Sequence, residues 1–138
     1  MKKHAATLLI LMLAALTGLV NAQTRILIKA DVPFDFVANG VKMPAGECAV
    51  ETQGQGTATL LIMSGKAQVF AIPHASWSLS TNKNSVMVFH RYGDRYFLSG
   101  IRREGRNEGY ELPASRAERE LRAQNVEEKD EILLAYAK

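Results

Sequence analysis

The sequence predicts a mainly β protein, a single domain built as a sandwich or partly open barrel of roughly seven to nine short antiparallel strands with one C-terminal helix. Three observations support this fold class. Several short segments alternate apolar and polar residues with the period of two that is typical of strands. Turn-forming Gly, Pro, Asn and Asp residues separate these segments. One segment, at about residues 115–125, has a helical pattern.

The N-terminal residues 1–22 have the pattern of a secretory signal peptide. Two lysines precede an apolar run from Ala5 to Val20, and Val20-Asn21-Ala22 has the small residues of a cleavage site. A retained membrane anchor is the alternative, but the run is shorter than the roughly 20 residues needed to span a bilayer. We therefore expect cleavage after Ala22, with no membrane span in the exported β-rich domain at residues 23–138.

The first strand pattern, at Arg25–Ala38, consists of two alternating stretches around Pro33. Proline cannot donate to a strand ladder, so we expect a sheet edge or a bend there. Asn39-Gly40 and Pro44–Gly46 predict turns. Thr57–Met63 is almost continuously apolar, which favours a strand buried on both faces. Further strands are expected at residues 47–53, 67–72, 76–79 and 110–112.

The segment Ser85–Arg102 has the clearest pattern in the chain and predicts a β-hairpin. Gly93-Asp94 at its centre favours a two-residue type II′ turn, which pairs Phe89 with Leu98 and His90 with Phe97. Because side chains alternate along a strand, we expect one face of the hairpin to contribute to the core. That predicted core face carries Met87, Phe89, Tyr96 and Leu98, with Arg91 at its rim.

The opposite face of the hairpin is a mixture of apolar, aromatic and basic side chains. Such a face is either half covered by another part of the protein or available to a partner. We predict that a ligand or partner surface, if one exists on this face, includes His90, Tyr92, Arg95 and Phe97.

A helix is predicted to begin at Ser115, because Ser115 and Glu118 have the spacing of a capping box. We expect about three turns ending near Asn125, with a short apolar stripe of Ala114, Ala117 and Leu121 facing the core. An acidic run follows, and it breaks the helical pattern. For this reason Ile132–Ala137 is predicted to be a strand rather than more helix.

The charge balance does not favour a nucleic-acid-binding protein. The whole chain has 17 basic and 14 acidic residues, so removal of Lys2 and Lys3 leaves 15 against 14, a net charge of +1. Binding to nucleic acid needs a concentrated basic surface. The one local cluster, Arg102, Arg103 and Arg106, is interrupted by glutamates and is typical of a solvated loop.

No catalytic residue is assigned from the sequence. Seven polar residues are worth testing, but the chain has no nucleophile-elbow motif around a serine. The seven are His74, His90, Arg91, Asp94, Arg95, Ser99 and Cys48. If the protein is an enzyme, the combination we consider is a small hydrolase using His90 with Asp94 or Ser99.

No metal or cofactor is predicted either. The histidines of residues 23–138, His74 and His90, form no close ligand pair, one cysteine cannot complete a zinc site, and no phosphate-binding glycine loop follows a strand. Cys48 alternates with Val50 and has no basic neighbour in sequence, so we expect a buried, unreactive thiol.

Four motifs together are similar to those of a family of small exported bacterial proteins that has no assigned biochemical function. They are VPFDFVANG at 32–40, PAGE at 44–47, FHRYGDRYFLS at 89–99 and ELPASRAEREL at 111–121. The resemblance covers most of the chain after the signal peptide and implies export and a single β-rich domain. It brings no active site. Cys48 stands where such proteins commonly have an aromatic residue, which argues against a catalytic cysteine.

The function expected from these observations is that of an exported, non-enzymatic structural or interaction module of the bacterial envelope or extracellular space. Its partner is expected to be a protein or an envelope component of unknown identity. The alternatives are the small hydrolase and a carrier that holds a small apolar ligand inside a barrel.

Overall fold

The computed structural model of the 138-residue chain describes residues 25–53 and 59–136. The predicted signal peptide and its cleavage after Ala22 lie outside the described residues. Within these ranges, no helix has the length and apolar character needed to cross a membrane.

Four strands form the first sheet, and all of its neighbours are antiparallel. In spatial order they are β1 (Arg25–Val32), β4 (Gly46–Gln53), β5 (Thr59–Ser64) and β6 (Ala67–Ala71). The β5–β6 turn contains Gly65 with a φ of +57°, a backbone conformation that favours glycine. The strands predicted at residues 47–53 and 67–72 are confirmed, with β6 ending one residue earlier than expected.

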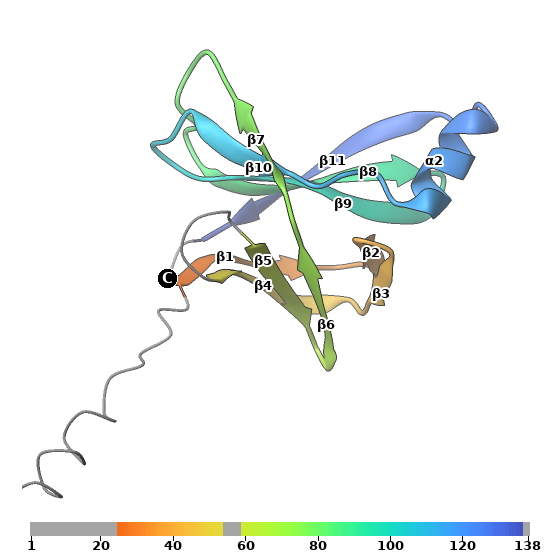
Figure 1. Cartoon of the computed structure of the whole chain (residues 1–138), viewed down its shortest axis with the longest axis horizontal. Coiled ribbons are helices and arrows are strands. Elements are labelled where there is room, and N and C mark those ends of the chain that lie inside the picture. The colour runs from red at the N-terminus through yellow and green to blue at the C-terminus, as the bar shows by residue number, and fades with distance from the viewer. Residues whose placement is uncertain (1–24, 54–58, 137–138) are drawn as a thin grey trace, which may run out of the picture.

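The second sheet has seven strands (Figure 1). Its main order is β11 (Glu128–Ala135), β8 (Ser85–Tyr92), β9 (Arg95–Arg102), β10 (Glu108–Glu111) and β7 (His74–Trp77). The short hairpin of β2 (Phe36–Ala38) and β3 (Val41–Met43) joins it where Val37 pairs in parallel with Phe97. The described part thus has eleven strands, more than predicted, because short strands form on both sides of Asn39-Gly40.

The β8–β9 hairpin has the predicted register. Phe89 lies opposite Leu98, and His90 lies opposite Phe97. Gly93 has a φ of +64°, whereas Asp94 is not among the described residues with positive φ, as a type II′ turn requires. The predicted core face is confirmed, because Phe89 is 0% exposed and Leu98 is 4% exposed.

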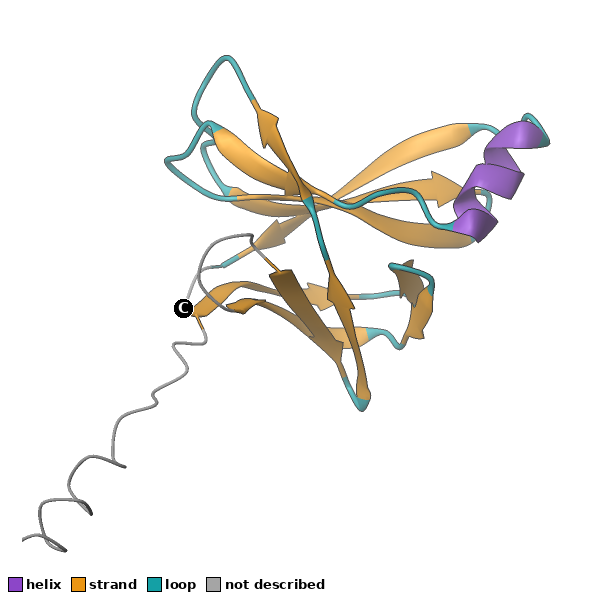
Figure 2. Ribbon diagram, viewed as in Figure 1, coloured by secondary structure: helices purple, strands orange, loops and turns teal. Residues whose placement is uncertain are grey.

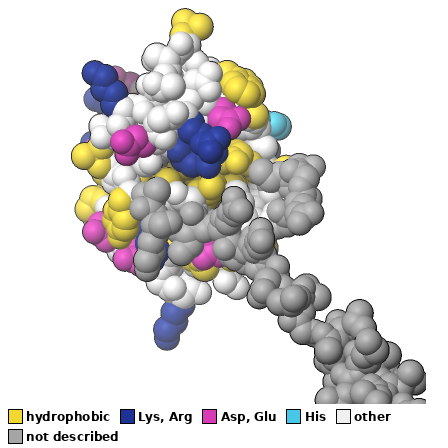
Figure 3. All heavy atoms as spheres, turned by 90° about the vertical axis from the view of Figure 1, so that its left-hand side faces the viewer, with side chains coloured by type: hydrophobic (Ala, Val, Ile, Leu, Met, Phe, Trp, Pro, Cys, Tyr) yellow, Lys and Arg dark blue, Asp and Glu magenta, His cyan; other side chains and the backbone are white. Residues whose placement is uncertain are grey.

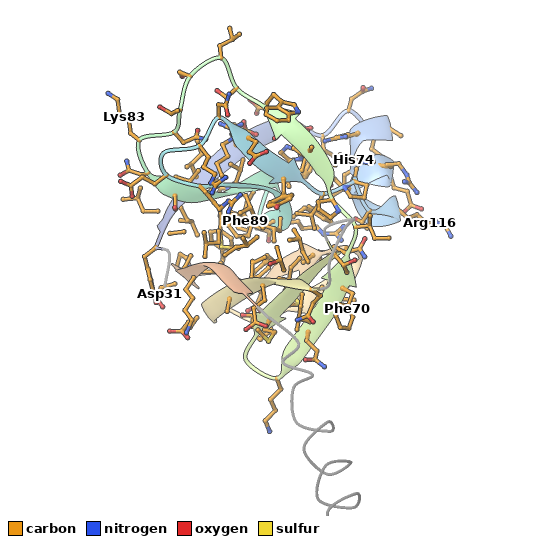
Figure 4. All side chains as sticks on the ribbon, turned by 60° about the vertical axis from the view of Figure 1, so that its left-hand side comes forward. Asp31, Phe70, His74, Lys83, Phe89 and Arg116 are labelled. Atoms are coloured by element: carbon orange, nitrogen blue, oxygen red, sulfur yellow. The ribbon has the colours of Figure 1, made fainter. Side chains whose placement is uncertain are left out.

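The two sheets pack face to face, with the helix at one end of the seven-stranded sheet (Figure 2). One hydrophobic cluster includes residues of both sheets. Phe89 lies between the sheets (Figure 4), where its ring meets the edges or faces of Phe34 and Phe36 at centroid distances of 5.1 and 5.2 Å. The sheets do not close into a barrel, so the predicted class of a mainly β sandwich or open structure is confirmed.

Besides the short loops that lead from β1 into β2 and from β3 into β4, two further links join the sheets. At one corner, Lys29 of β1 and Tyr136, just after β11, exchange backbone hydrogen bonds of 2.8 and 2.9 Å. At another, the chain runs from β6 into β7 through Ile72 and Pro73, so one nearly continuous ribbon passes from the first sheet to the second (Figure 1).

The helix α2 (Arg116–Ala123) begins as predicted, since the Ser115 side chain accepts a hydrogen bond from the Glu118 N–H at 3.3 Å. Asn125, just beyond its end, has a φ of +56°. The predicted apolar stripe of Ala114, Ala117 and Leu121 is wrong. These three residues are only half-buried, and the one buried residue of the helix is Glu118.

Two strand predictions also need correction. β5 alternates buried and half-buried residues and is not buried on both faces, because no layer covers the outer side of the described four-stranded sheet (Figure 2). β11 begins at Glu128, so the acidic run that was expected to separate helix from strand is itself part of the strand. The choice of strand over helix for this C-terminal segment is confirmed.

Candidate functional site: a histidine and carboxylate cluster beside the helix

The outer face of the seven-stranded sheet carries a cluster of polar side chains from three elements. The antiparallel register of β8 and β11 places His90 opposite Asp130 and Tyr92 opposite Glu128. These four side chains therefore point to the same side of the sheet. The helix α2 lies over this face and contributes Glu118 and Arg122 to the cluster. These two residues are one helical turn apart and form an ion pair of 3.3 Å.

The Glu118 carboxylate is the centre of the cluster, with only 4% of its side chain exposed. Its Oε1 lies 2.5 Å from His90 Nδ1 and 3.0 Å from the Tyr92 hydroxyl. Arg122 Nη2 donates to the same oxygen at 3.3 Å. A buried charge is tolerated only when such partners replace water. The capping-box prediction is thus half correct, because the Glu118 side chain turns to the sheet while its N–H bonds Ser115.

The Tyr92 hydroxyl links Glu118 to a second carboxylate, that of Glu128. It lies 2.8 Å from Glu128 Oε2 and accepts a hydrogen bond from Arg122 Nε at 2.8 Å. Arg122 Nε also donates to Glu128 Oε2 at 3.0 Å. Burial and the two carboxylates raise the pKa of Tyr92, so the phenol stays neutral and acts as a donor. The pKa of Glu128 is lowered, because Tyr92, His90 and Arg122 together outweigh the opposing effect of burial.

His90 is half-buried and has carboxylates facing both ring nitrogens. Its Nδ1–H donates to Glu118, and its Nε2 lies 3.4 Å from Glu128 Oε1 and 3.9 Å from Asp130 Oδ1. Arg122 Nη2 is 3.2 Å from Nδ1, but a nitrogen that already donates to Glu118 cannot accept from Arg122. The hydrogen bond to Glu118 is the main cause that raises the pKa of His90, while burial and Arg122 oppose it.

A polar pocket of about 360 Å³ lies beside this cluster, on the part of the sheet that α2 leaves open. Its floor includes Val88 and Gly100, and His90 and Glu118 form part of its wall on the helix side. The pocket is also lined by Asp130, opposite His90, and by the polar residues His74, Ser76, Ser99, Arg102 and Glu111. His74 is exposed on the neighbouring edge strand β7 (Figure 4).

The predicted ligand or partner surface is divided by the helix. His90 is half-buried and Arg95 is exposed, but Tyr92 and Phe97 are each 2% exposed. The Tyr92 ring packs edge to face on Phe97, and its hydroxyl bonds the α2 side chains. The contacts with α2 and the packing of the two rings therefore remove Tyr92 and Phe97 from the surface.

The residues of the hydrolase alternative are not assembled around His90. Asp94 lies at the hairpin turn, in a different, open pocket of about 620 Å³ that also includes Asp35 and Lys42. Ser99 lines the His90 pocket, but its hydroxyl donates to the Val88 carbonyl at 3.2 Å. In the described part of the chain, His90 makes polar contacts with the side chains of Glu118, Arg122, Glu128 and Asp130.

Cys48 is 0% exposed and shares its buried face with Val50, as predicted. Its cross-strand neighbours are Ala30 and Ser64, neither of which is charged. Burial raises the pKa of the Cys48 thiol to about 12. The thiol is therefore neutral near pH 7 and belongs to the core.

Sequence reasoning missed Glu118, Arg122, Glu128 and Asp130 as members of a site. The spacing of Glu118 and Arg122 on one helix face was the available signal, together with a strand that begins with acidic residues. The sequence pattern of histidine pairs and cysteines does not reveal the carboxylates beside His90, because they lie on a strand far along the chain and become its neighbours only in the folded sheet.

Comparison of the chain with protein-family models, with curated proteins and with solved structures found no match. The fold and the cluster define a mainly β protein of two facing sheets with a charged network under its helix. The resemblance to small exported bacterial proteins stays a prediction.

Proposed function

We propose that the protein is an exported, non-enzymatic interaction module of the bacterial envelope or extracellular space. The observation that carries this proposal is the uncovered part of the outer face of the seven-stranded sheet. There, Ile132 is 57% exposed and Leu134 is 71% exposed, beside the polar pocket. We call this part the open face; it is formed by the exposed Ile132 and Leu134, the half-buried Val86, the buried Val88 at their base, and the pocket.

The open face combines apolar and charged groups in the manner of a protein-binding surface. Ile132 lies opposite Val88 and Leu134 opposite Val86, so the four apolar side chains form adjoining pairs across β11 and β8. Arg102, Glu111 and Asp130 surround the pocket beside them. An apolar patch with a polar border is typical of protein contacts, in which the patch is buried and the border sets specificity.

The mixed charges favour a protein partner over nucleic acid. The open face has both signs of charge, and basic and acidic side chains are also interspersed on the face of the molecule in Figure 3. Export is supported by the signal-peptide pattern of residues 1–22.

The two alternatives have less support. A hydrolase needs a nucleophile beside its base, whereas both nitrogens of His90 face carboxylates. A barrel carrier needs a closed interior, whereas the sheets here are open and the core cluster lies between them.

Site-specific photo-crosslinking in cells that make the protein tests the proposal. A photoreactive phenylalanine analogue at Leu134 is expected to yield one discrete crosslinked protein, and Ile132→Asp in the same chain is expected to abolish that product. The matched control places the analogue at Gln68, an exposed position on β6, which should yield no such product. Crosslinks that are absent at Leu134, or equal at both positions, would contradict the assignment of the open face.

A further inference from the structure

We propose that His90, Glu128 and Asp130 form a binding site for a divalent transition-metal cation of the Zn²⁺ class. One ring nitrogen of His90 and one carboxylate oxygen from each acidic residue all lie within 4.8 Å of one another. The three residues come from the paired strands β8 and β11, and Asp130 lies directly opposite His90. Ligands on paired strands are held by the sheet and not by a loop.

The separation of the His90 and Glu128 ligand atoms fits a small cation, whereas Asp130 has to move closer to complete the site. Zn²⁺ is bound at about 2.0–2.2 Å by His and carboxylate ligands, which places neighbouring ligand atoms roughly 3.0–3.5 Å apart. His90 Nε2 lies 3.4 Å from Glu128 Oε1 and 3.9 Å from Asp130 Oδ1. The Asp130 side chain is 62% exposed, so a small rotation in water is enough to bring its oxygen closer.

Hydrogen bonds from neighbouring groups orient the proposed ligands. The buried Glu118 carboxylate accepts from His90 Nδ1 at 2.5 Å, which leaves Nε2 as the metal-facing nitrogen. Metal-binding histidines usually donate their other N–H to a carboxylate or carbonyl in this way. Similarly, Tyr92 and Arg122 hold Glu128 Oε2 at 2.8 and 3.0 Å, which leaves Oε1 directed toward His90.

The charges of the cluster also fit a divalent ion. Arg122 forms ion pairs with both Glu118 and Glu128, at 3.3 and 3.0 Å, and supplies one positive charge to a cluster with three carboxylates. With His90 in the neutral form that a metal ligand requires, the cluster therefore has a surplus of negative charge that a divalent ion neutralises. One imidazole and two carboxylates suit Zn²⁺, and three protein ligands leave a position for water or a group of a partner.

Isothermal titration of the metal-stripped, tag-free full-length protein with ZnCl₂ tests the site. Wild type is expected to bind one ion per chain. His90→Gln and Asp130→Asn should each weaken binding at least roughly tenfold, and Glu118→Gln, which removes the orienting carboxylate, should weaken it by roughly 10–100-fold. Glu127→Gln is the matched control, because Glu127 is exposed, lies next to the site in sequence and is paired with Lys129.

Circular dichroism of each variant separates loss of the site from loss of the fold. Asp130→Asn is decisive if His90→Gln does not fold, because Asp130 is exposed and is replaced by a residue of the same size. Absence of Zn²⁺ binding to the wild type, or equal affinity of folded Asp130→Asn, Glu127→Gln and wild type, would overturn the proposal. The second result would place the ion elsewhere on the chain.

Discussion

The two faces of the β8–β9 hairpin are built in different ways. The inner face presents Met87, Phe89 and Leu98 to the hydrophobic core, where no polar partner is needed. The outer face presents His90 and Tyr92 to Glu118 and a network of hydrogen bonds. Packing on the inner face depends on shape and apolar area, whereas the outer face depends on every charged group having a partner. The same two strands therefore serve both as a core element and as a platform for a polar site.

The inner face should be the more sensitive to truncation. Phe89→Ala removes a ring that is 0% exposed and contacts Phe34 and Phe36, so we expect a loss of about 3–5 kcal/mol in the free energy of unfolding. Urea unfolding measures the loss. Phe70→Ala is the control, because Phe70 is 57% exposed on an edge strand, and its loss should stay below about 1 kcal/mol. Similar losses in both variants would mean that Phe89 is not at the centre of the core.

On the outer face, Glu118→Ala should cost about 2–3 kcal/mol, because it leaves the hydroxyl of Tyr92 and the ring of His90 without their shared partner. The expected loss of stability is smaller than for a fully buried ion pair, because His90 and Arg122 retain access to water. Chemical denaturation again measures it. The exposed Glu120, paired with Arg116 on the same helix, provides the control: Glu120→Ala should change stability by less than about 0.5 kcal/mol. Equal effects at the two positions would remove the special role of Glu118.

The Gly93-Asp94 turn joins β8 and β9 and sets the register of both faces of the hairpin. Gly93→Val should cost about 1–3 kcal/mol, because a branched side chain is strained at a φ of +64°. Space is not the cause, since no heavy atom lies within 4 Å of a Cβ built on Gly93. Asp94→Asn should be close to neutral, because asparagine suits the same turn position. Thermal melting of both variants is the measurement, and a Gly93→Val protein as stable as wild type would contradict the turn geometry.

The thiol of Cys48 makes the stability of the uncharged core depend on pH in the alkaline range. Since burial raises the pKa of Cys48 from 9.0 to about 12, the unfolded chain loses this proton at lower pH than the folded protein does. This shift contributes to the free energy of unfolding. The contribution is fully present below pH 9 and is lost as the pH rises from 9 toward 12, with about 1 kcal/mol lost at pH 10. Stability measured at pH 8 and pH 10 should fall less in Cys48→Ala than in wild type. Parallel declines would show that the thiol has no part in this pH dependence.

The difference between the two faces also explains what the sequence could predict. The hairpin register follows from neighbouring residues, because alternation and Gly93-Asp94 specify it locally. The start of α2 is local too, since Ser115 and Glu118 are three residues apart.

The direction of the Glu118 carboxylate is not a local property. It depends on His90 and Tyr92, which lie on a strand far away in the chain, and the helix-start pattern is compatible with either direction. Likewise, the apolar run in β5 contains no information about whether a second layer covers its outer side. The fold class was therefore predictable from the sequence, while the members of the cluster were not.

The corner between β1 and the end of β11 constrains the order in which the protein can fold. Lys29 and Tyr136 exchange two backbone hydrogen bonds although nearly all of the described chain lies between them. A chain that leaves a ribosome or a secretion channel from its N-terminus can form the β1–β4 and β8–β9 pairs early, but this corner must wait for Tyr136. Until then the edges of β1 and β8 lack the partners supplied at the C-terminus and can pair with other chains. Completion of synthesis or translocation is thus the step that pairs β8 with β11 and bonds Lys29 to Tyr136, and a protein interrupted before β11 lacks both of these contacts.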